Sequence, residues 1–359
     1  MKIVTVIGAR PQFIKAASFS RVLLSEKVDE IIVHTGQHFD DNMSKVFFDE
    51  MGIPKPKYNL NINNLSHGAM TGRMMEEIEN ILLIEKPDLV VVYGDTNSTL
   101  AGALAAKKLH IKIAHIEAGL RSFNNKMPEE INRILTDRIS DYLFCPTQSA
   151  IDNLNNEGFN NIDCHIVKTG DISLDSALYY SINGAKDKQF SESELPKNYI
   201  FSTLHRPENT DKKECLFGIV NALNYIHKNI QPVVLAIHPR TKTKLIEYDL
   251  ELKVKTIDPV GYIEVIRLIK NSNLVLTDSG GLQKEAYFFK KPCVTLREQT
   301  EWVELIENKV NVLVGSNEIK IKLGVEHMLE RDCDFSKEIF GKGKTANEII
   351  KFLKSQKDD

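Results

Sequence analysis

The chain has 359 residues, of which 42% are hydrophobic and 26% are charged, and its formal net charge at pH 7 is -3. This length predicts two domains, and the composition is typical of a globular protein. The balanced charge provides no basic field, so we expect no nucleic-acid partner. The five cysteines are widely spaced and form no CxxC pair, which argues against a disulfide framework or a zinc site. The first residues do not show the pattern of a signal peptide, and no run approaches the roughly 20 apolar residues of a membrane helix. We therefore expect a cytoplasmic protein without membrane contact.

Short apolar runs alternate with helical patterns along the first half of the chain. Pro11 suits the first turn of the first helix, where its missing N–H does no harm. Small residues at 101–105 favour a helix that packs closely on a sheet. The alternation predicts a parallel sheet with helices on both faces. Its strands are predicted at 2–7, 30–34, 88–93, 111–116 and 141–145.

A polar segment at 181–197 interrupts this alternation, which then resumes. A second α/β unit is therefore predicted to begin near residue 170. Two such domains facing each other would form a cleft at the carboxyl ends of their sheets, where open α/β folds bind ligands. The strands of the second unit are predicted at 200–205, 233–238, 274–278 and 293–296.

The segment Asp278-Ser279-Gly280-Gly281 joins a predicted strand to a predicted helix. Two glycines allow close approach of a ligand, and the N-terminus of the helix offers free N–H groups to an anion. We therefore favour a phosphate site over a plain turn. Glu285 follows in the same helix, as either an acceptor for ribose hydroxyls or a surface charge. The GKT at 343–345 is not a P-loop, because Glu338 stands where that motif needs glycine.

Three carboxylates follow predicted strands or begin a helix in the first half, namely Asp95, Glu117 and Glu130. Asp95 suits either helix capping or catalysis. Glu129 and Arg133 have the spacing of a surface ion pair on the predicted helix. Glu130 instead lies on the same face of that helix as apolar residues. Three converging carboxylates, with at least one pKa raised, would suit proton transfer at a weakly acidic C–H group.

Carboxylates close to a phosphate ligand need compensating cations. In the second half, His205 and His238 each lead a polar cluster at the end of a predicted strand, on the side where Asp278 is expected. The candidate cations are Arg10, Lys15, His205, Arg206 and Arg240.

Eight motifs occur in order along the chain: GARPQFIK (8–15), TGQH (35–38), GDTNST (94–99), HIEAGLR (115–121), PEEINR (128–133), HRPEN (205–209), HPR (238–240) and DSGG (278–281). Together they resemble the non-hydrolysing UDP-N-acetylglucosamine 2-epimerases over essentially the whole chain. The resemblance implies two Rossmann-like domains in the GT-B arrangement, with the active site in the cleft between them. The first domain would comprise 1–169, joined by the C-terminal helix 345–359, and the UDP-binding domain would comprise 170–344.

The resemblance also implies the chemistry: elimination of UDP across C1–C2, a glycal intermediate, and re-addition of UDP with inverted C2, which converts UDP-GlcNAc to UDP-ManNAc for cell-envelope polysaccharide. It implies a UDP-sugar substrate, no cofactor, no metal and a homodimer. By motif, the catalytic residues are Asp95, Glu117, Glu130 and His205. The substrate-binding residues are Arg10, Lys15, Arg206, His238, Asp278, Ser279, Gly280, Gly281 and Glu285.

Three departures from the common family pattern leave the substrate open. Gln12 stands where glutamate is commoner, Asp40 where allosterically activated members tend to carry glutamine, and Trp302 where arginine is usual. These variants resemble the branch that acts on UDP-2,3-diacetamido-2,3-dideoxy-glucuronic acid. Asp40 predicts weak or absent activation by a second substrate molecule. A GT-B glycosyltransferase, a hydrolysing epimerase and a non-catalytic UDP-sugar-binding protein are the alternatives.

Overall fold

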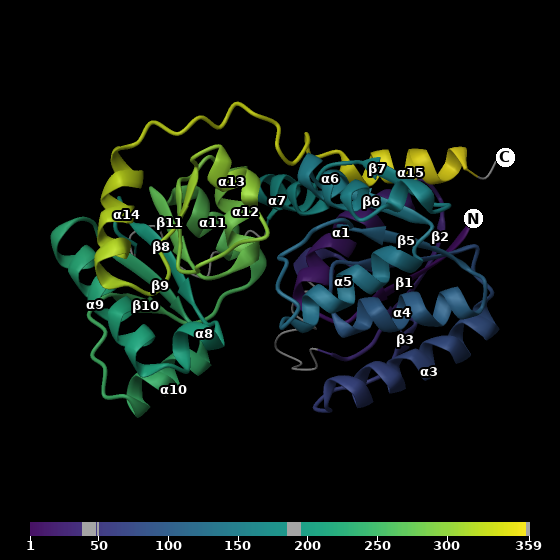
Figure 1. The fold of residues 1–359 in the computed structure, drawn as a ribbon, viewed down its shortest axis with the longest axis horizontal. Helices are drawn as coiled ribbons and strands as arrows, with labels where there is room; N and C mark the ends of the chain where they lie inside the picture. Colours follow the sequence, from purple (N-terminus) through teal and green to yellow (C-terminus); the bar gives the residue numbers. More distant parts are fainter. Residues whose placement is uncertain (38–47, 49, 185–194, 357–359) are drawn as a thin grey trace. The chain divides into compact units, whose positions relative to one another are not determined.

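The structure is a computed structural model that describes residues 1–37, 48, 50–184 and 195–356. The prediction on Asp40 and the last residue of the TGQH motif lie outside these residues. The chain divides into two compact units, Met1–Tyr179 with Ile339–Asp359, and Tyr180–Glu338. Each unit contains one parallel sheet covered by helices, which confirms the predicted α/β class (Figure 1).

The first unit has a seven-stranded sheet in the order β3-β2-β1-β4-β5-β6-β7, and all neighbours are parallel. The five predicted strands are confirmed, each beginning within one residue of its predicted start. The bounds are β1 (Lys2–Ile7), β2 (Asp29–His34), β3 (Tyr58–Asn59), β4 (Leu89–Tyr93), β5 (Lys112–Ile116), β6 (Tyr142–Cys145) and β7 (His165–Lys168).

The helices of this unit pack against the sheet through apolar and small residues. A Cβ added at Gly102 would lie 3.2 Å from the side-chain carbons of Val6, so the small residues do bring α4 close to β1. The bounds are α1 (Arg10–Ser25), α3 (His67–Glu85), α4 (Asn97–Lys108), α5 (Pro128–Ile139), α6 (Gln148–Asn156), a short 3₁₀ turn at Phe159–Asn161, α7 (Ile172–Asn183), which runs across the division, and α15 (Thr345–Ser355).

Helix α15 belongs to the first unit although it ends the described chain. At its N-terminus the carboxylate of Asp175 accepts hydrogen bonds from the backbone N–H groups of Thr345, at 3.1 Å, and Ala346, at 2.8 Å. These are the N–H groups that an anion would otherwise bind. The GKT segment therefore serves to start a docked helix, in agreement with the rejection of a P-loop.

The second unit has a six-stranded parallel sheet in the order β10-β9-β8-β11-β12-β13. The four predicted strands are confirmed, and each ends one residue earlier than predicted. His205, His238 and Asp278 therefore lie just beyond the sheet. The bounds are β8 (Ile200–Leu204), β9 (Val233–Ile237), β10 (Lys255–Ile257), β11 (Leu274–Thr277), β12 (Cys293–Thr295) and β13 (Asn311–Leu313).

Alternate residues of the second sheet enter two separate cores. Ile200 packs in a core with apolar residues of α9 and α14, whereas Phe201 packs in another with residues of α11 and α12. The bounds of the helices are α8 (Pro207–Thr210), α9 (Lys213–Asn229), α10 (Pro239–Glu247), α11 (Tyr262–Asn271), α12 (Gly280–Phe288), α13 (Val303–Glu307) and α14 (Glu318–Glu330). Within the described part of the chain, no helix has the length and apolar character needed to cross a membrane.

Candidate functional site

Two of the predicted carboxylates lie in neighbouring loops of the first unit. Strands β4 and β5 run parallel with Tyr93 opposite Ile116, and the backbone N–H of Gly94 donates to the carbonyl of Ile116 at 3.0 Å. Glu117 follows directly after β5, and Asp95 lies two residues beyond the end of β4. The sheet therefore brings the two loops together, as the strand-end pattern predicts.

Glu117 forms an ion pair with Lys15, which reaches it from α1. The two side chains are only 11% and 7% exposed, so the pair is shielded from solvent. A Cβ added at Gly94 would lie 3.3 Å from the Lys15 ammonium and 3.4 Å from a Glu117 carboxylate oxygen. The pair therefore lies against the Gly94 backbone. One predicted cation, Lys15, thus neutralises one predicted catalytic acid.

The backbone of Glu117 has a positive φ of 74°, which is uncommon outside glycine. The carbonyl of Phe144 accepts hydrogen bonds from the N–H groups of both Glu117 and Ala118, each at 3.1 Å. A residue in this conformation persists when its surroundings over-determine it, and such residues cluster at functional sites. The Phe144 carbonyl therefore helps to hold the Glu117 backbone in this conformation.

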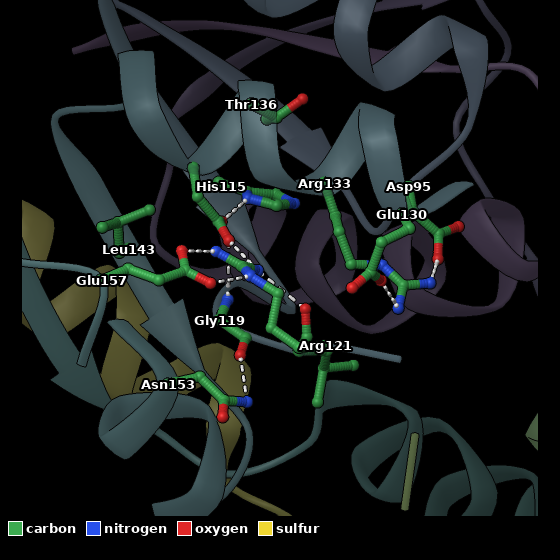
Figure 2. A network of polar contacts seen from close by, with 12 residues as sticks. Asp95, His115, Gly119, Arg121, Glu130, Arg133, Thr136, Leu143, Asn153 and Glu157 are labelled. Carbon is green, nitrogen blue, oxygen red and sulfur yellow. Dashed lines mark hydrogen bonds and ion pairs between the residues drawn. The ribbon is translucent and has the colours of Figure 1, made fainter. Parts of the chain in front are cut away.

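Arg133 links the other two predicted carboxylates (Figure 2). Its guanidinium forms an ion pair with Asp95 and donates to Glu130 at 2.9 Å. The Arg133 side chain is only 6% exposed, whereas Glu129 is exposed. The predicted position of Arg133 in a surface pair with Glu129 is therefore wrong, because the packed face of α5 turns Arg133 inward.

The carboxylate of Glu130 is buried and holds the loop that precedes α5. It accepts hydrogen bonds from the backbone N–H groups of Ser122, at 3.0 Å, and Phe123, at 2.8 Å. The Ser122 hydroxyl donates to it as well, at 3.0 Å. Together with Arg133, these contacts make Glu130 an anchor for the loop. A direct catalytic role for Glu130 stays a prediction.

Asp95 does not cap α4, so the capping interpretation is wrong. The cap is Thr96, whose side chain accepts a hydrogen bond from the N–H of Thr99. Asn132 donates its side-chain amide to the backbone carbonyl of Asp95 at 2.9 Å. The Asp95 carboxylate, 32% exposed, is thus held by Arg133 and still reaches solvent. Neither Asn132 nor the inward position of Arg133 is predicted by the sequence pattern.

In the second unit, the buried carboxylate of Asp278 holds the turn that carries His205. It accepts the backbone N–H groups of His205, at 3.0 Å, and Arg206, at 2.8 Å, and one of its oxygens lies 3.1 Å from His205 Nδ1. Burial alone would raise the pKa of Asp278, but its interactions with His205 and the two backbone N–H groups outweigh burial and lower it. Asp278 is therefore a buried support for the loop after β8.

The predicted histidines lie close together at the ends of β8 and β9. The ring centroids of His205 and His238 are 5.9 Å apart, and the His205 side chain is 41% exposed. Arg240, proposed as a compensating cation, forms an ion pair with Asp211. Arg206 is half-buried beside His205, and Arg10 begins α1 in the first unit. Only some of the predicted cations therefore lie at predicted site residues within each unit. Lys15 pairs with Glu117 in the first unit, and Arg206 adjoins His205 in the second.

The N-terminus of α12 has the features expected of an anion site. Ser279 is the N-cap residue, but its hydroxyl does not cap the helix. A Cβ added at Gly281 would have only the Ser279 hydroxyl nearby, at 3.9 Å, whereas one at Gly280 would lie 2.3 Å from a Glu301 oxygen. A side chain at Gly280 would therefore displace the Glu301 carboxylate, whereas the first turn is open at Gly281. Glu285 is only 7% exposed, which excludes the surface-charge interpretation.

Two of the departures from the common family pattern are buried. The Gln12 amide donates to the carbonyl of Tyr93 and to the hydroxyl of Thr99, both at 3.0 Å. The Trp302 ring lies 4.2 Å from the Lys284 ammonium. Both residues therefore act within the framework of their unit. Across the described residues, no group of His, Cys, Asp and Glu side chains is arranged to hold a metal ion.

Comparison with known proteins adds independent evidence. A family model for UDP-N-acetylglucosamine 2-epimerase matches residues 22–354. A UDP-2,3-diacetamido-2,3-dideoxy-D-glucuronate 2-epimerase of Pseudomonas aeruginosa is 55% identical over 354 residues, covering 98% of this chain and 99% of the relative. A UDP-N-acetylglucosamine 2-epimerase of Methanocaldococcus jannaschii is 46% identical over 364 residues, with 98% and 99% covered. A crystal structure of the M. jannaschii UDP-GlcNAc 2-epimerase with UDP-GlcNAc and UDP matches with a TM-score of 0.89 and 45% identity, covering 99% of this chain and 100% of that one.

Proposed function

The chain belongs to the UDP-N-acetylglucosamine 2-epimerase family, and from this premise we propose that it inverts C2 of a UDP-linked 2-acetamido sugar while UDP stays attached to the product. As a family member it is an isomerase that acts as a UDP-sugar 2-epimerase. The observation that carries the mechanism is the pairing of loops after β4 and β5. These neighbouring loops carry Asp95 and Glu117, and the Glu117 carboxylate is paired with Lys15.

The reaction proceeds by elimination and re-addition. A base removes the C2 proton, the C1–O bond breaks, and its electron pair passes to the β-phosphate oxygen of departing UDP. The resulting glycal then accepts UDP again at C1, and C2 receives a proton on the opposite face. Proton transfer on two faces requires two acid–base groups close to C2. Glu117 and Asp95 are the groups that we assign to these steps.

The surrounding residues support both carboxylates. Lys15 orients the Glu117 carboxylate through their shielded ion pair. Arg133 orients Asp95, and Glu130 orients Arg133. Because Asp95 and Glu130 share one guanidinium, loss of Glu130 is expected to disturb Asp95 as well. Glu130 then contributes to catalysis through Arg133, which agrees with its motif position.

The second unit supplies the groups that bind UDP. The open first turn of α12 offers backbone N–H groups and the positive end of the helix dipole to the diphosphate. His205, Arg206 and His238 add donors, and the buried Glu285 accepts from ribose hydroxyls. Negative charge builds on UDP as the C1–O bond breaks, so donors that are already oriented stabilise the transition state most. Asp278 takes part indirectly, by holding His205 and Arg206.

We assign UDP-2,3-diacetamido-2,3-dideoxy-D-glucuronate as the preferred substrate and UDP-GlcNAc as the second candidate. The support is the 55% identity with the P. aeruginosa enzyme of that name, against 46% with the M. jannaschii UDP-GlcNAc enzyme. The departures at Gln12 and Trp302 point to the same branch. On the family resemblance, we also propose a homodimer that supplies a cell-envelope polysaccharide; light scattering tests the dimer.

The test is proton exchange in D₂O. The enzyme is incubated with each UDP-sugar in turn, and the C2 proton is followed by NMR together with the phosphorus signals of UDP. We expect loss of the C2 proton signal, an epimer that retains UDP, and faster turnover of the diacetamido uronate. Glu117→Gln, which preserves shape and removes the carboxylate, serves as the control and should lose exchange. Free UDP in step with free sugar would instead indicate a hydrolase. Binding without exchange of either substrate would contradict epimerisation.

A further inference from the structure

A buried polar network contacts the two loops that carry Asp95 and Glu117, through Gly94 and Gly119. Figure 2 shows the part of it around His115 and Arg121. Its centre is His115, the fourth residue of β5, whose side chain is fully buried. The His115 Nε2 atom lies 2.7 Å from the carbonyl oxygen of Gly94, and Nδ1 lies 2.7 Å from a carboxylate oxygen of Asp137 on α5. Because a carbonyl only accepts, Nε2 carries a proton and donates it to Gly94.

The Asp137 carboxylate extends the network to the second loop. Its other oxygen accepts the backbone N–H of Gly119 at 3.1 Å and the Arg121 guanidinium at 2.7 Å. Arg121 in turn donates two hydrogen bonds to Glu157, each at 2.7 Å. Burial alone would raise the pKa of Asp137, but the positive charges and hydrogen bonds of His115 and Arg121 outweigh burial and lower it.

The two backbone groups that the network binds flank the proposed proton-transfer residues. Gly94 immediately precedes Asp95, and Gly119 follows Glu117 by two residues. Asn153 fixes Gly119 from the other side by donating to its carbonyl at 3.0 Å. The loop is also closely packed there, since a Cβ added at Gly119 would lie 2.4 Å from the carbonyl oxygen of Ala150. The positive φ of Glu117 is thus maintained by contacts on both sides of its loop.

We propose that His115 and Asp137 are positioning residues for proton transfer, and that the His115–Gly94 hydrogen bond sets the place of Asp95 relative to Glu117. This inference rests on the proposed epimerase function. Neither side chain is exposed, so neither reaches the substrate. Their effect is on distance: a misplacement of about 1 Å in a reacting group costs on the order of a hundredfold in rate. Loss of the Gly94 bond should therefore lower kcat and leave UDP binding unchanged.

Two substitutions at one position separate the two halves of the network. In His115→Gln, the side-chain amide reaches the place of Nε2 and can still donate to Gly94. In His115→Asn, the shorter amide reaches the place of Nδ1 and can donate to Asp137 but not to Gly94. Each variant loses one buried hydrogen bond, so both should be destabilised similarly. We expect kcat of the asparagine variant to be about tenfold to a hundredfold below that of the glutamine variant, with equal KM and equal affinity for UDP by calorimetry.

Equal kcat values for the two variants, or a lower kcat for glutamine, would overturn the proposal. Exchange is measured on the wild type in parallel: an inactive wild type refutes the epimerase function, whereas an active wild type with indistinguishable variants refutes only the positioning role. If either variant fails to fold, Asp137→Ala replaces the pair, because it removes the acceptor of His115 and Gly119 together. We expect its kcat to be about tenfold to a hundredfold below wild type with UDP affinity unchanged, and a folded variant with wild-type kcat overturns the proposal.

Discussion

The carboxylate of Asp175, which binds the first N–H groups of α15, makes the stability of the first unit depend on pH. Burial raises the pKa of Asp175 from 3.8 to about 6, more than offsetting the backbone hydrogen bonds that lower it. A raised pKa means that the folded state holds this proton more tightly than the unfolded state. The resulting stabilisation is fully present below about pH 4 and is lost as the pH rises through about 6. At about 1.4 kcal/mol per pKa unit, the shift corresponds to about 3 kcal/mol.

The Asp175→Asn variant isolates this contribution, because asparagine has the same shape and cannot titrate. We expect the free energy of unfolding of wild type, relative to the variant, to fall by about 2.4 kcal/mol between pH 4 and pH 7, because a part of the total is already lost at pH 4. The other carboxylates titrate in both chains and cancel in the difference. The single tryptophan, Trp302, lies in the second unit, so urea unfolding should be followed by circular dichroism of the helices.

The exposed Asp163 provides a matched control in the same unit. The difference in unfolding free energy between wild type and Asp163→Asn should stay flat across this pH range. A flat curve for Asp175→Asn as well would refute the reasoning, because the buried carboxyl would then titrate alike in both states. A wild-type advantage that grows with pH would refute it too, since it would mean that the hydrogen bonds to Thr345 and Ala346 outweigh burial.

Three further predictions concern other buried groups. Gln12→Glu places an acceptor against the Tyr93 carbonyl and should cost about 1–3 kcal/mol at pH 8, and less at pH 5 where the new carboxyl can hold a proton; equal losses in urea unfolding at both pH values would contradict this. Lys15→Met removes the cation beside Glu117 and should lower kcat about a hundredfold with UDP affinity unchanged in calorimetry; full activity would rule out the pair's role. Burial raises the pKa of Cys293 to about 12, so iodoacetamide at pH 8 should label it only after unfolding, as mass spectrometry can establish.

The strand pattern predicted the centre of each sheet and missed every edge. Strands β3 and β7 border the first sheet, and β10 and β13 border the second. An edge strand pairs on one side only and is partly exposed, as β7 is along its whole length. It therefore needs no continuous apolar run, and the signal that identifies a buried parallel strand is absent from it. The central strands, which are covered on both faces, show that signal clearly.

The positions of Asp95, Glu117 and His205 could be predicted because strand ends are visible in sequence and parallel strands end at one edge of a sheet. The partners of these residues could not. The spacing of α5 allows Arg133 to pair with Glu129 at i,i+4 or with Glu130 at i,i+3, and local sequence does not decide between them. The decision comes from packing: the face of α5 that turns toward the sheet buries Arg133 and Glu130 together and leaves Glu129 in solvent.

The position of His115 in a buried strand is a sequence signal for a polar network. It lies in the run KIAHI, whose last four residues are all buried. A histidine in such a strand needs a hydrogen-bond partner for each ring nitrogen, because burying an unpaired polar group is costly. The sequence thus requires an acid or a carbonyl near His115 but does not identify Asp137, which lies 22 residues further on and in a different element. Only the packing of α5 on β5 joins them, and it does so beneath the loops where the proposed chemistry takes place.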